Sequence, residues 1–534
     1  MFKSNYIMIP NSKKDFLFDL INSLSPSEKR NFKLFAKRLA ANEGAKFLLL
    51  FDALDKMSAY NEQQLLEKAP VTKKQLSNMK AHLYKQVLTS LRLLYADRNI
   101  ELQLNEQIDF GRILFNKGLY MQSLKTLDKA KQVASLYSLD TIMLRVVEME
   151  KVIESQHITR SIKNRADILS EEASVLSKRV DLKNRFSSLS LQLYGIYLKT
   201  GYIKDREGRE MLESFYKQNM PVYDFMTLGF YEKMYLFQAQ VWYFHIIQDF
   251  PVCYRAAQHW VDLFHSEPQM IKVATGSYLK AYHYLLDTLF YLGYYERFAM
   301  VLREFKVSVQ QKDFILDGNS RILSFLYLYS NMINFYFLKG DFTKGVKEIV
   351  PDLLRDIAPL KRKLDVHHLM VLHYKIACLY FGSGDNERAI VYLDQVIQNS
   401  QIGLREDLQC FAHILKLIAS YEAGIDEKLD GQIRNVYRFL IKMDDLHQVQ
   451  KEMMRFIRNL SRIYDHELKG AFIELREKLL VYENHPFEKR AFLYLDIISW
   501  LESKIENRLV QEIIRQKFSE KIKREKYRIS NNGL

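Results

Sequence analysis

Glycine, proline and cysteine are scarce in this sequence. Its 534 residues include 19 glycines, 9 prolines and 3 cysteines. Proteins rich in strands and loops need more turn-forming residues, so this scarcity favours long helices joined by short connections. The cysteines (Cys253, Cys378 and Cys410) are odd in number and widely spaced. This spacing argues against a disulfide framework and suits a reducing cytoplasm.

Long apolar runs and targeting segments are also missing. Residues 1–20 contain several lysines and no continuous apolar run, which argues against a secretory signal. The longest uncharged stretch, Ile322–Leu338, includes two asparagines and two serines that lipid would disfavour. We therefore expect no membrane span and a cytoplasmic location.

Catalytic and metal-binding motifs are absent as well. The sequence has no glycine-rich nucleotide loop ending in Lys-Ser/Thr, no His-Glu-x-x-His and no calcium loop. His367, His368 and His373 lie near one another, but no further ligand set at metal-binding spacing accompanies them. His283 and Asp287 are four residues apart, which is a common and generic helical pair. We expect no enzymatic activity, no cofactor and no metal site.

Hydrophobic residues make up 48% of the chain, with 33 tyrosines and 33 phenylalanines. That composition is typical of a folded protein with an aromatic core. A chain of this length exceeds one compact core, so we expect several domains or a repeat array. The net charge of +14 is concentrated at the ends. Residues 1–100 hold 17 Lys/Arg against 9 Asp/Glu, and residues 507–534 hold 8 against 3.

A repeated helix–turn–helix pair accounts for most of the chain. One copy places small and aromatic residues around Gly118, and similar copies surround Gly293, Gly340 and Gly384. The first copy is carried by Gly111, Leu114, Gly118, Tyr120, Ser123, Leu127 and Ala130. A small residue allows two helices to approach, a glycine permits the turn, and the following aromatic packs one helix on the other. This pattern resembles the tetratricopeptide repeat.

Weaker copies extend the array. They centre on His157, Gly201, Gln248 and Gly424, with a doubtful last copy near His466. The eight hinges from Gly118 to Gly424 are spaced by 39, 44, 47, 45, 47, 44 and 40 residues. The family's own repeat has about 34 residues, so each pair here is longer and the chain is better described as tetratricopeptide-like.

The resemblance implies an all-α fold: a right-handed α-solenoid of about eight to nine helical hairpins. We expect a basic N-terminal helical domain at 1–100, the solenoid at 101–485, and a capping helix with a basic tail at 486–534. The capping helix is predicted from the apolar stripe Phe492, Leu495, Ile498, Leu501, Ile505 and Leu509. As a whole, the arrangement resembles uncharacterised bacterial repeat proteins.

Two basic regions are candidates for contact with nucleic acid or an acidic partner. In the N-terminal domain, Ser25 and Asn61 are expected helix caps, and a long helix follows Thr72. Its polar face carries Lys74, Asn78, His82, Lys85 and Arg92, which could read a DNA groove or simply be solvated. At the other end of the chain the candidates are Lys517, Lys521, Lys523, Arg524, Lys526 and Arg528.

The inner surface of the solenoid is the third candidate. In such repeats the first helix of each pair lines the concave side, and its exposed positions fall about thirteen, ten, six and three residues before the hinge. The partner-binding candidates read at these positions are Tyr235, Gln238, Trp242, His245, Lys280, His283, Asp287, Phe290, Tyr327, Asn334, Phe337, Tyr374 and Phe381. Such aromatics suit a bound peptide, or they pack against one another in a tightly wound superhelix.

One function of the family can be tested directly. Repeats that clamp a peptide's C-terminal carboxylate place Lys and Asn at fixed groove positions of successive repeats. Six residues before the hinges stand Arg112, Lys151, Gly195, Trp242, Asp287, Asn334, Cys378 and Ile418, which is not that pattern. We therefore expect a non-enzymatic scaffold or adaptor for a protein or peptide segment. The alternative is a nucleic-acid-associated regulator in which residues 60–95 form a helix-turn-helix-like segment beside sensing repeats.

Overall fold

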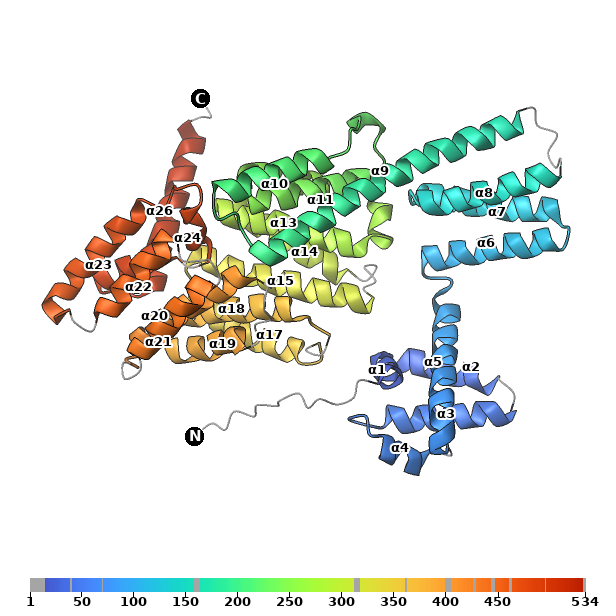
Figure 1. The fold of residues 1–534 in the computed structure, drawn as a ribbon, viewed down its shortest axis with the longest axis horizontal. Coiled ribbons are helices and arrows are strands. Elements are labelled where there is room, and N and C mark those ends of the chain that lie inside the picture. Colours follow the sequence, from blue (N-terminus) through green and yellow to red (C-terminus); the bar gives the residue numbers. More distant parts are fainter. Residues whose placement is uncertain are drawn as a thin grey trace. The chain divides into compact units, whose positions relative to one another are not determined.

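The computed structural model describes residues 15–38, 41–69, 71–157, 164–311, 317–360, 363–398, 405–425, 429–442, 447–460, 463–494 and 496–531. These residues form α-helices and a few short 3-10 turns, and no strand occurs among them (Figure 1). The predicted all-α helical repeat is confirmed; its right-handed sense stays a prediction. The chain divides into two compact units, Met1–Leu176 and Ser177–Leu534.

The first unit begins with five helices around one apolar core. They are α1 (Phe16–Ser23), α2 (Pro26–Lys37), α3 (Ala41–Asp55), α4 (Glu62–Lys68) and α5 (Lys73–Tyr95). Their core includes Phe32, Phe51 and Leu83, all almost completely buried. The predicted caps form: the Glu28 amide donates to Ser25 Oγ at 3.3 Å, and the Gln64 amide donates to Asn61 Oδ1 at 3.1 Å.

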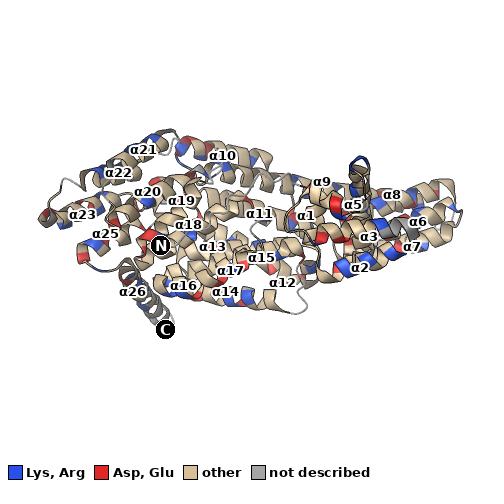
Figure 2. Ribbon diagram, turned by 90° about the horizontal axis from the view of Figure 1, so that it is seen from below, with Lys and Arg blue, Asp and Glu red and all other residues tan. Residues whose placement is uncertain are grey.

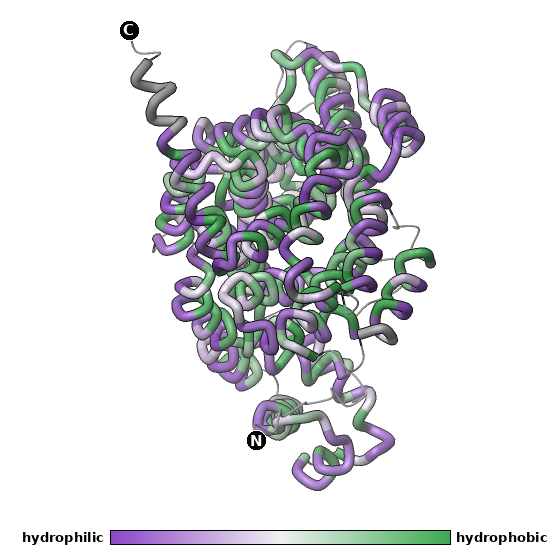
Figure 3. Tube along the Cα trace, turned by 90° about the vertical axis from the view of Figure 1, so that its left-hand side faces the viewer, coloured by the Kyte–Doolittle hydropathy of each residue, from purple (hydrophilic) through white to green (hydrophobic). Residues whose placement is uncertain are grey.

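Three further helices and the start of a fourth complete the first unit. They are α6 (Ile100–Asn116), α7 (Tyr120–Leu136), α8 (Asp140–Gln156) and the beginning of α9 (Arg165–Thr200). α6, α7 and α8 each bury part of their surface, as their buried residues show. Hydrophobic and hydrophilic residues are interspersed along the tube of the described chain (Figure 3). Where α6 and α7 meet, Ser123 Oγ donates a hydrogen bond of 2.7 Å to the Gly111 carbonyl, which shows how close the two helices approach.

The second unit is built of helix pairs. The first helices of its pairs are the end of α9, α11 (Phe230–Ile246), α13 (Thr275–Leu292), α15 (Gly318–Lys339), α18 (Val366–Ser383), α20 (Glu406–Glu422) and α22 (Gln448–Leu460). The second helices are α10 (Arg206–Asn219), α12 (Phe250–Ser266), α14 (Tyr295–Gln310), α16 (Phe342–Glu348) with α17 (Val350–Ile357), α19 (Asn386–Gln398), α21 (Leu429–Lys442) and α23 (Asp465–Leu480).

The hinges lie where the sequence pattern placed them. Gly118, Gly201, Gln248, Gly293, Gly340, Gly384 and Gly424 all have positive φ, the left-handed conformation that ends a helix. His157 is the exception, because its backbone is extended with φ −144°. Ser138, between α7 and α8, is a left-handed turn residue that the glycine-based pattern did not indicate.

The C-terminal stripe does not form one helix. Phe492 lies in α24 (Ala491–Tyr494), the isoleucines and Leu501 lie in α25 (Ile497–Glu506), and Leu509 directly precedes α26 (Val510–Asn531). Leu495 lies outside the described residues, and Asn507 turns the chain in the left-handed conformation with φ 52°. α26 then packs on α15 and α18. Its backbone comes so close to the hinge at Gly340 that a Cβ atom there would lie 2.7 Å from the Arg515 amide nitrogen.

Candidate functional site

The second unit brings polar side chains from its first helices together. We call this set the first-helix cluster. Its members are Tyr194, Tyr197, Trp242, His245, Lys280, His283, Tyr284, Asp287, Tyr327, Asn331, Asn334, His367, Tyr374, Lys375, Cys378, Arg405 and Asp407. Figure 2 shows that charged residues are sparse along α11, α13 and α18, so the few charged members stand in mainly uncharged helices.

A contact between α9 and the start of α20 closes the cluster on one side. The Arg405 amide donates to the Leu198 carbonyl at 3.0 Å, and Arg405 Nη1 donates to Tyr197 Oη at 3.2 Å. The guanidinium lies 4.9 Å from the centre of the Tyr197 ring and forms an ion pair with Asp407 at 2.9 Å. These side chains of Arg405 and Asp407 are 6% and 0% exposed. Arg405 therefore joins the start of α20 to α9, and its ion pair with Asp407 holds the guanidinium beside Tyr197, which is 208 residues away in the chain.

Ring stacking and amide hydrogen bonds connect α13, α15 and α18. His283 stacks on Tyr327 with ring centres 4.3 Å apart, and Asn331 Nδ2 donates to His283 Nδ1 at 3.0 Å. Asn331 Nδ2 also donates to the Tyr327 carbonyl at 2.7 Å, which fixes the orientation of this amide. Since Nδ1 of His283 is an acceptor here, the ring carries its hydrogen on Nε2. Burial, followed by the charges of Lys375 and other nearby groups, lowers the pKa of His283 and keeps it neutral.

Three charged side chains occupy the cluster without an ion-pair partner. Lys375 donates a hydrogen bond of 2.7 Å to Asn334 Oδ1, and Lys280 lies 5.3 Å from the centre of the Tyr194 ring. Among the described residues, neither ammonium forms an ion pair, and the Asp287 carboxylate accepts no hydrogen bond. All three side chains are only partly exposed.

The pKa values of these groups follow from their burial. Burial lowers the pKa of Lys375 to about 8, although Asp287 partly opposes this shift. Burial lowers the pKa of Lys280 as well. It raises the pKa of Asp287 to about 6, against the opposing effect of Lys375 and Arg405. The charged forms are thus less stable here than in water, as expected where no counter-ion lies close.

Several buried polar atoms in the cluster have no hydrogen-bond partner in the described part of the chain. They are Trp242 Nε1, His245 Nδ1, Asn331 Oδ1, Asn334 Nδ2 and His367 Nδ1. The side chains of Trp242, His245, Asn331 and Asn334 are at most 1% exposed. An unpaired buried polar group costs about 1–3 kcal/mol, so such atoms normally bond to ordered water or to a ligand.

The structure separates the thirteen predicted groove residues into two sets. Buried side chains are those of Trp242, His245, Tyr327, Asn334, Tyr374 and Phe381. Partly exposed side chains are those of Tyr235, Gln238, Lys280, His283, Asp287, Phe290 and Phe337. Aromatic packing accounts for part of the burial, since the Trp242 ring contacts both Tyr194 and Tyr284 with ring centres 4.8 Å apart. The second set keeps some contact with solvent.

Sequence reasoning missed Lys375, Asn331 and Tyr284, which stand nine residues before their hinges, a position that was not read. Lys375 could have been found, because it is the only Lys, Arg, Asp or Glu in α18. It also missed Arg405 and Asp407, because the contact of Arg405 with α9 joins segments that are far apart in the sequence.

The candidate basic regions lie outside this cluster. On α5, the side chains of Lys74, Asn78, His82, Lys85 and Arg92 are all exposed, as expected. The His82 ring nevertheless packs on Phe47 with centres 4.8 Å apart, and Arg92 lies 3.8 Å from Asp109. Pro70, in the turn before α5, lies outside the described residues.

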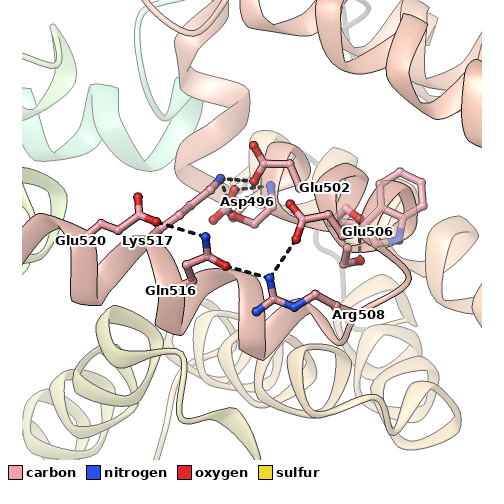
Figure 4. A network of polar contacts seen from close by, with 10 residues as sticks. Asp496, Glu502, Glu506, Arg508, Gln516, Lys517 and Glu520 are labelled. Carbon is pink, nitrogen blue, oxygen red and sulfur yellow. Dashed lines mark hydrogen bonds and ion pairs between the residues drawn. The ribbon is translucent and has the colours of Figure 1, made fainter.

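The candidates on α26 are partly engaged within the chain. Lys517 forms an ion pair of 2.6 Å with Glu502 and donates to Ser499 Oγ at 2.9 Å (Figure 4). Lys521 donates to the Leu292 carbonyl at the end of α13 at 3.2 Å. Lys523 is exposed. The side chains of Arg524, Lys526 and Arg528 lie outside the described ones.

Comparisons with known proteins add no identification: no family model matches the chain, and neither a curated protein nor a solved structure matches it. In the part of the chain that the structure describes, no three His, Cys, Asp or Glu residues are grouped so that they could hold a metal ion. No helix of that part is both long and apolar enough to cross a membrane.

Proposed function

We propose that this protein is a non-enzymatic scaffold or adaptor that holds a segment of a partner protein against the first helices of its tetratricopeptide-like repeats. The observation that carries the proposal is the set of buried, unpaired polar atoms in the first-helix cluster. Asn331 offers an unpaired acceptor and Asn334 an unpaired donor, three residues apart on one helix face. A peptide group needs one donor and one acceptor, so this pair is suited to it.

Two features favour binding over catalysis. Burial raises the pKa of the Cys378 thiol to about 12, so a nucleophilic thiolate does not form at neutral pH. His245 is buried and His367 is half-buried; desolvation lowers the pKa of each to about 3 and leaves them unable to act as general acids near pH 7.

The test is affinity purification from native cells at low salt, with half of each sample treated with nuclease. We compare the wild type with Asn334→Ala and with a control, Asn219→Ala, whose side chain is exposed on α10. The proposal predicts proteins that persist after nuclease treatment with the wild type and the control, and that are depleted at least about tenfold with Asn334→Ala, the equivalent of about 1.4 kcal/mol. Equal recovery with all three proteins would contradict it.

A nucleic-acid-associated regulator is the second candidate, favoured by the exposed basic face of α5. Replacement of Lys74, Lys85 and Arg92 by glutamate would then abolish nucleic-acid binding, and the affinity of the wild type would fall steeply with salt. If the chain binds neither DNA nor RNA at low salt, this candidate is wrong.

A further inference from the structure

Two lysines of the first-helix cluster lack the anion that buried cations ordinarily have. Lys280 comes from α13 and Lys375 from α18. Lys280 stands three residues before His283 on α13, and His283 Nδ1 accepts from Asn331 of α15 at 3.0 Å. Lys375 donates at 2.7 Å to Asn334, one turn after Asn331 on α15. The two lysines therefore approach one region of the cluster from two helices, and burial and both of their charges lower the pKa of His283. In a folded protein, a buried ammonium usually pairs with a carboxylate, because removal from water is otherwise costly.

The groups around these lysines add hydrogen-bond donors. Asn334 Nδ2 and Trp242 Nε1 are buried and unpaired. His283 has its hydrogen on Nε2, since its Nδ1 accepts from Asn331. The amide of Asn334 is oriented with Nδ2 as the unpaired donor, because its Oδ1 already accepts from Lys375. Lys280, His283, Asn334 and Lys375 thus present donors from three helices.

Among the described residues, no carboxylate pairs with either lysine, and Lys375 donates only to the neutral Asn334 Oδ1. Asp287 is the carboxylate that shifts the pKa of Lys375, yet it lies beyond ion-pair distance. The other carboxylates near the cluster are engaged: Asp407 pairs with Arg405, and Asp365 accepts a hydrogen bond of 2.5 Å from His368 Nδ1. The rings of Tyr194, Trp242 and Tyr284 contact one another beside Lys280 and supply an apolar surface.

We propose that Lys280 and Lys375, with Asn334 and His283, form a binding site for an oxyanion, either a carboxylate or a phosphate ester, whose organic part lies on the neighbouring aromatic rings. Two ammonium groups and two N–H donors match an oxyanion, which offers only acceptors. The inference deepens the proposed function: the oxyanion would belong to the partner segment or to a small molecule bound in its place. Lys280 and Asn334 were predicted from the sequence as groove residues. Their proximity to Lys375, which completes the set of donors, results from the fold.

The test uses the full chain and three soluble probes: benzoate, phenyl phosphate and inorganic phosphate. Isothermal titration measures their affinity for the wild type, for Lys280→Met and for Lys375→Met. The control is Lys272→Met, in the same unit, where the lysine is exposed. We expect saturable binding of benzoate or phenyl phosphate by the wild type and the control, and a loss of at least about tenfold in either test variant.

Each outcome decides the inference. Preference for benzoate or for phenyl phosphate identifies the oxyanion, and weaker binding of inorganic phosphate assigns a role to the rings. Thermal unfolding shows that the variants are folded, because replacement of an unpaired buried cation by methionine is expected to stabilise the protein. The inference is overturned if the wild type binds no probe, or if both variants bind as well as the control.

A further titration identifies the source of the oxyanion. A peptide from any captured partner is titrated with its C-terminus free or amidated, and with its acidic residues replaced by amides. If none of these changes alters the affinity of the partner peptide, the inference is overturned while the proposed function stands. Binding of the probes without any protein partner supports the inference and contradicts the proposed function.

Discussion

Lys375 Nζ donates a hydrogen bond of 2.7 Å to Asn334 Oδ1. The Asp287 carboxylate opposes the lowering of the Lys375 pKa but lies outside ion-pair distance. This relationship joins α18 to α15 and leaves an ammonium in the interior of the second unit with only a neutral partner. A cation of this kind makes the unit less stable than an apolar residue would, so it is retained at a cost. Ligand binding supplies a reason to retain it.

Replacement of Lys375 by methionine should stabilise the ligand-free protein near pH 7. The folded pKa of about 8 is lower than the unfolded value of about 10.4, so the contribution of Lys375 to stability is present above about pH 10.4 and is lost as pH falls through 8. We expect Lys375→Met to gain roughly 1–3 kcal/mol at pH 7. Urea unfolding in buffers free of phosphate and carboxylates measures it, and a loss of stability would contradict the account.

Asp287→Asn should change how stability depends on pH in the acidic range. The folded pKa of about 6 exceeds the unfolded value of about 3.9, so the stability contributed by the protonated carboxyl is complete below about pH 4 and is lost as pH rises through 6. Lys375 on α18 and Arg405 on α20 limit the loss. Relative to Asp287→Asn, the wild type should lose roughly 1–3 kcal/mol between pH 4 and pH 7.

Unfolding curves of the two proteins at several pH values provide the measurement. Parallel pH profiles would mean that the Asp287 carboxyl is as well solvated in the folded protein as in the unfolded chain.

The contact between Arg405 and α9 should be important for the stability of the second unit. Arg405→Ala removes the ion-pair partner of the buried Asp407, which we expect to cost about 3–5 kcal/mol in urea unfolding. The matched control is Arg206→Ala, which removes an exposed ion pair with Glu210 and should cost less than about 0.5 kcal/mol. Similar effects of the two substitutions would show that the α9–α20 contact does not hold the unit together.

Alanine substitution should be more disruptive at the Gly340 hinge than at the Gly384 hinge, because α26 packs against Gly340 alone of the two. Both glycines have positive φ, so alanine at either position costs about 1 kcal/mol. At Gly340 the added Cβ would also meet the α26 backbone at 2.7 Å, whereas nothing lies within 4 Å at Gly384. We expect Gly340→Ala, but not Gly384→Ala, to loosen α26 and to accelerate tryptic cleavage after Lys517. Equal cleavage rates would place α26 elsewhere.

The hinges were accessible to sequence reasoning because their chemistry is local. A glycine that ends a helix, followed within two residues by an aromatic, is visible in the chain, and Gly118, Gly293 and Gly340 all adopt the left-handed conformation. Ser138 adopts it too, but its side chain gives no such signal. α9, with 36 residues, is also much longer than the regular spacing of the hinges indicated.

The site was only partly predictable, since it depends on distant contacts. The four groove positions came from a repeat with about 34 residues and did not include the position nine residues before the hinge, where Lys375 stands and contacts Asn334. The contact of Arg405 with Leu198 joins helices that no local pattern relates. The exposure of each side chain depends on such distant contacts and not on its spacing in the sequence.

The central claim is that a partner binds on the first helices of the second unit. Hydrogen–deuterium exchange of the full chain, with and without the captured partner, tests it most directly. We predict slower exchange in α13, α15 and α18, and unchanged exchange in α5. Protection confined to α5 or α26, with none in the first helices, would contradict the account.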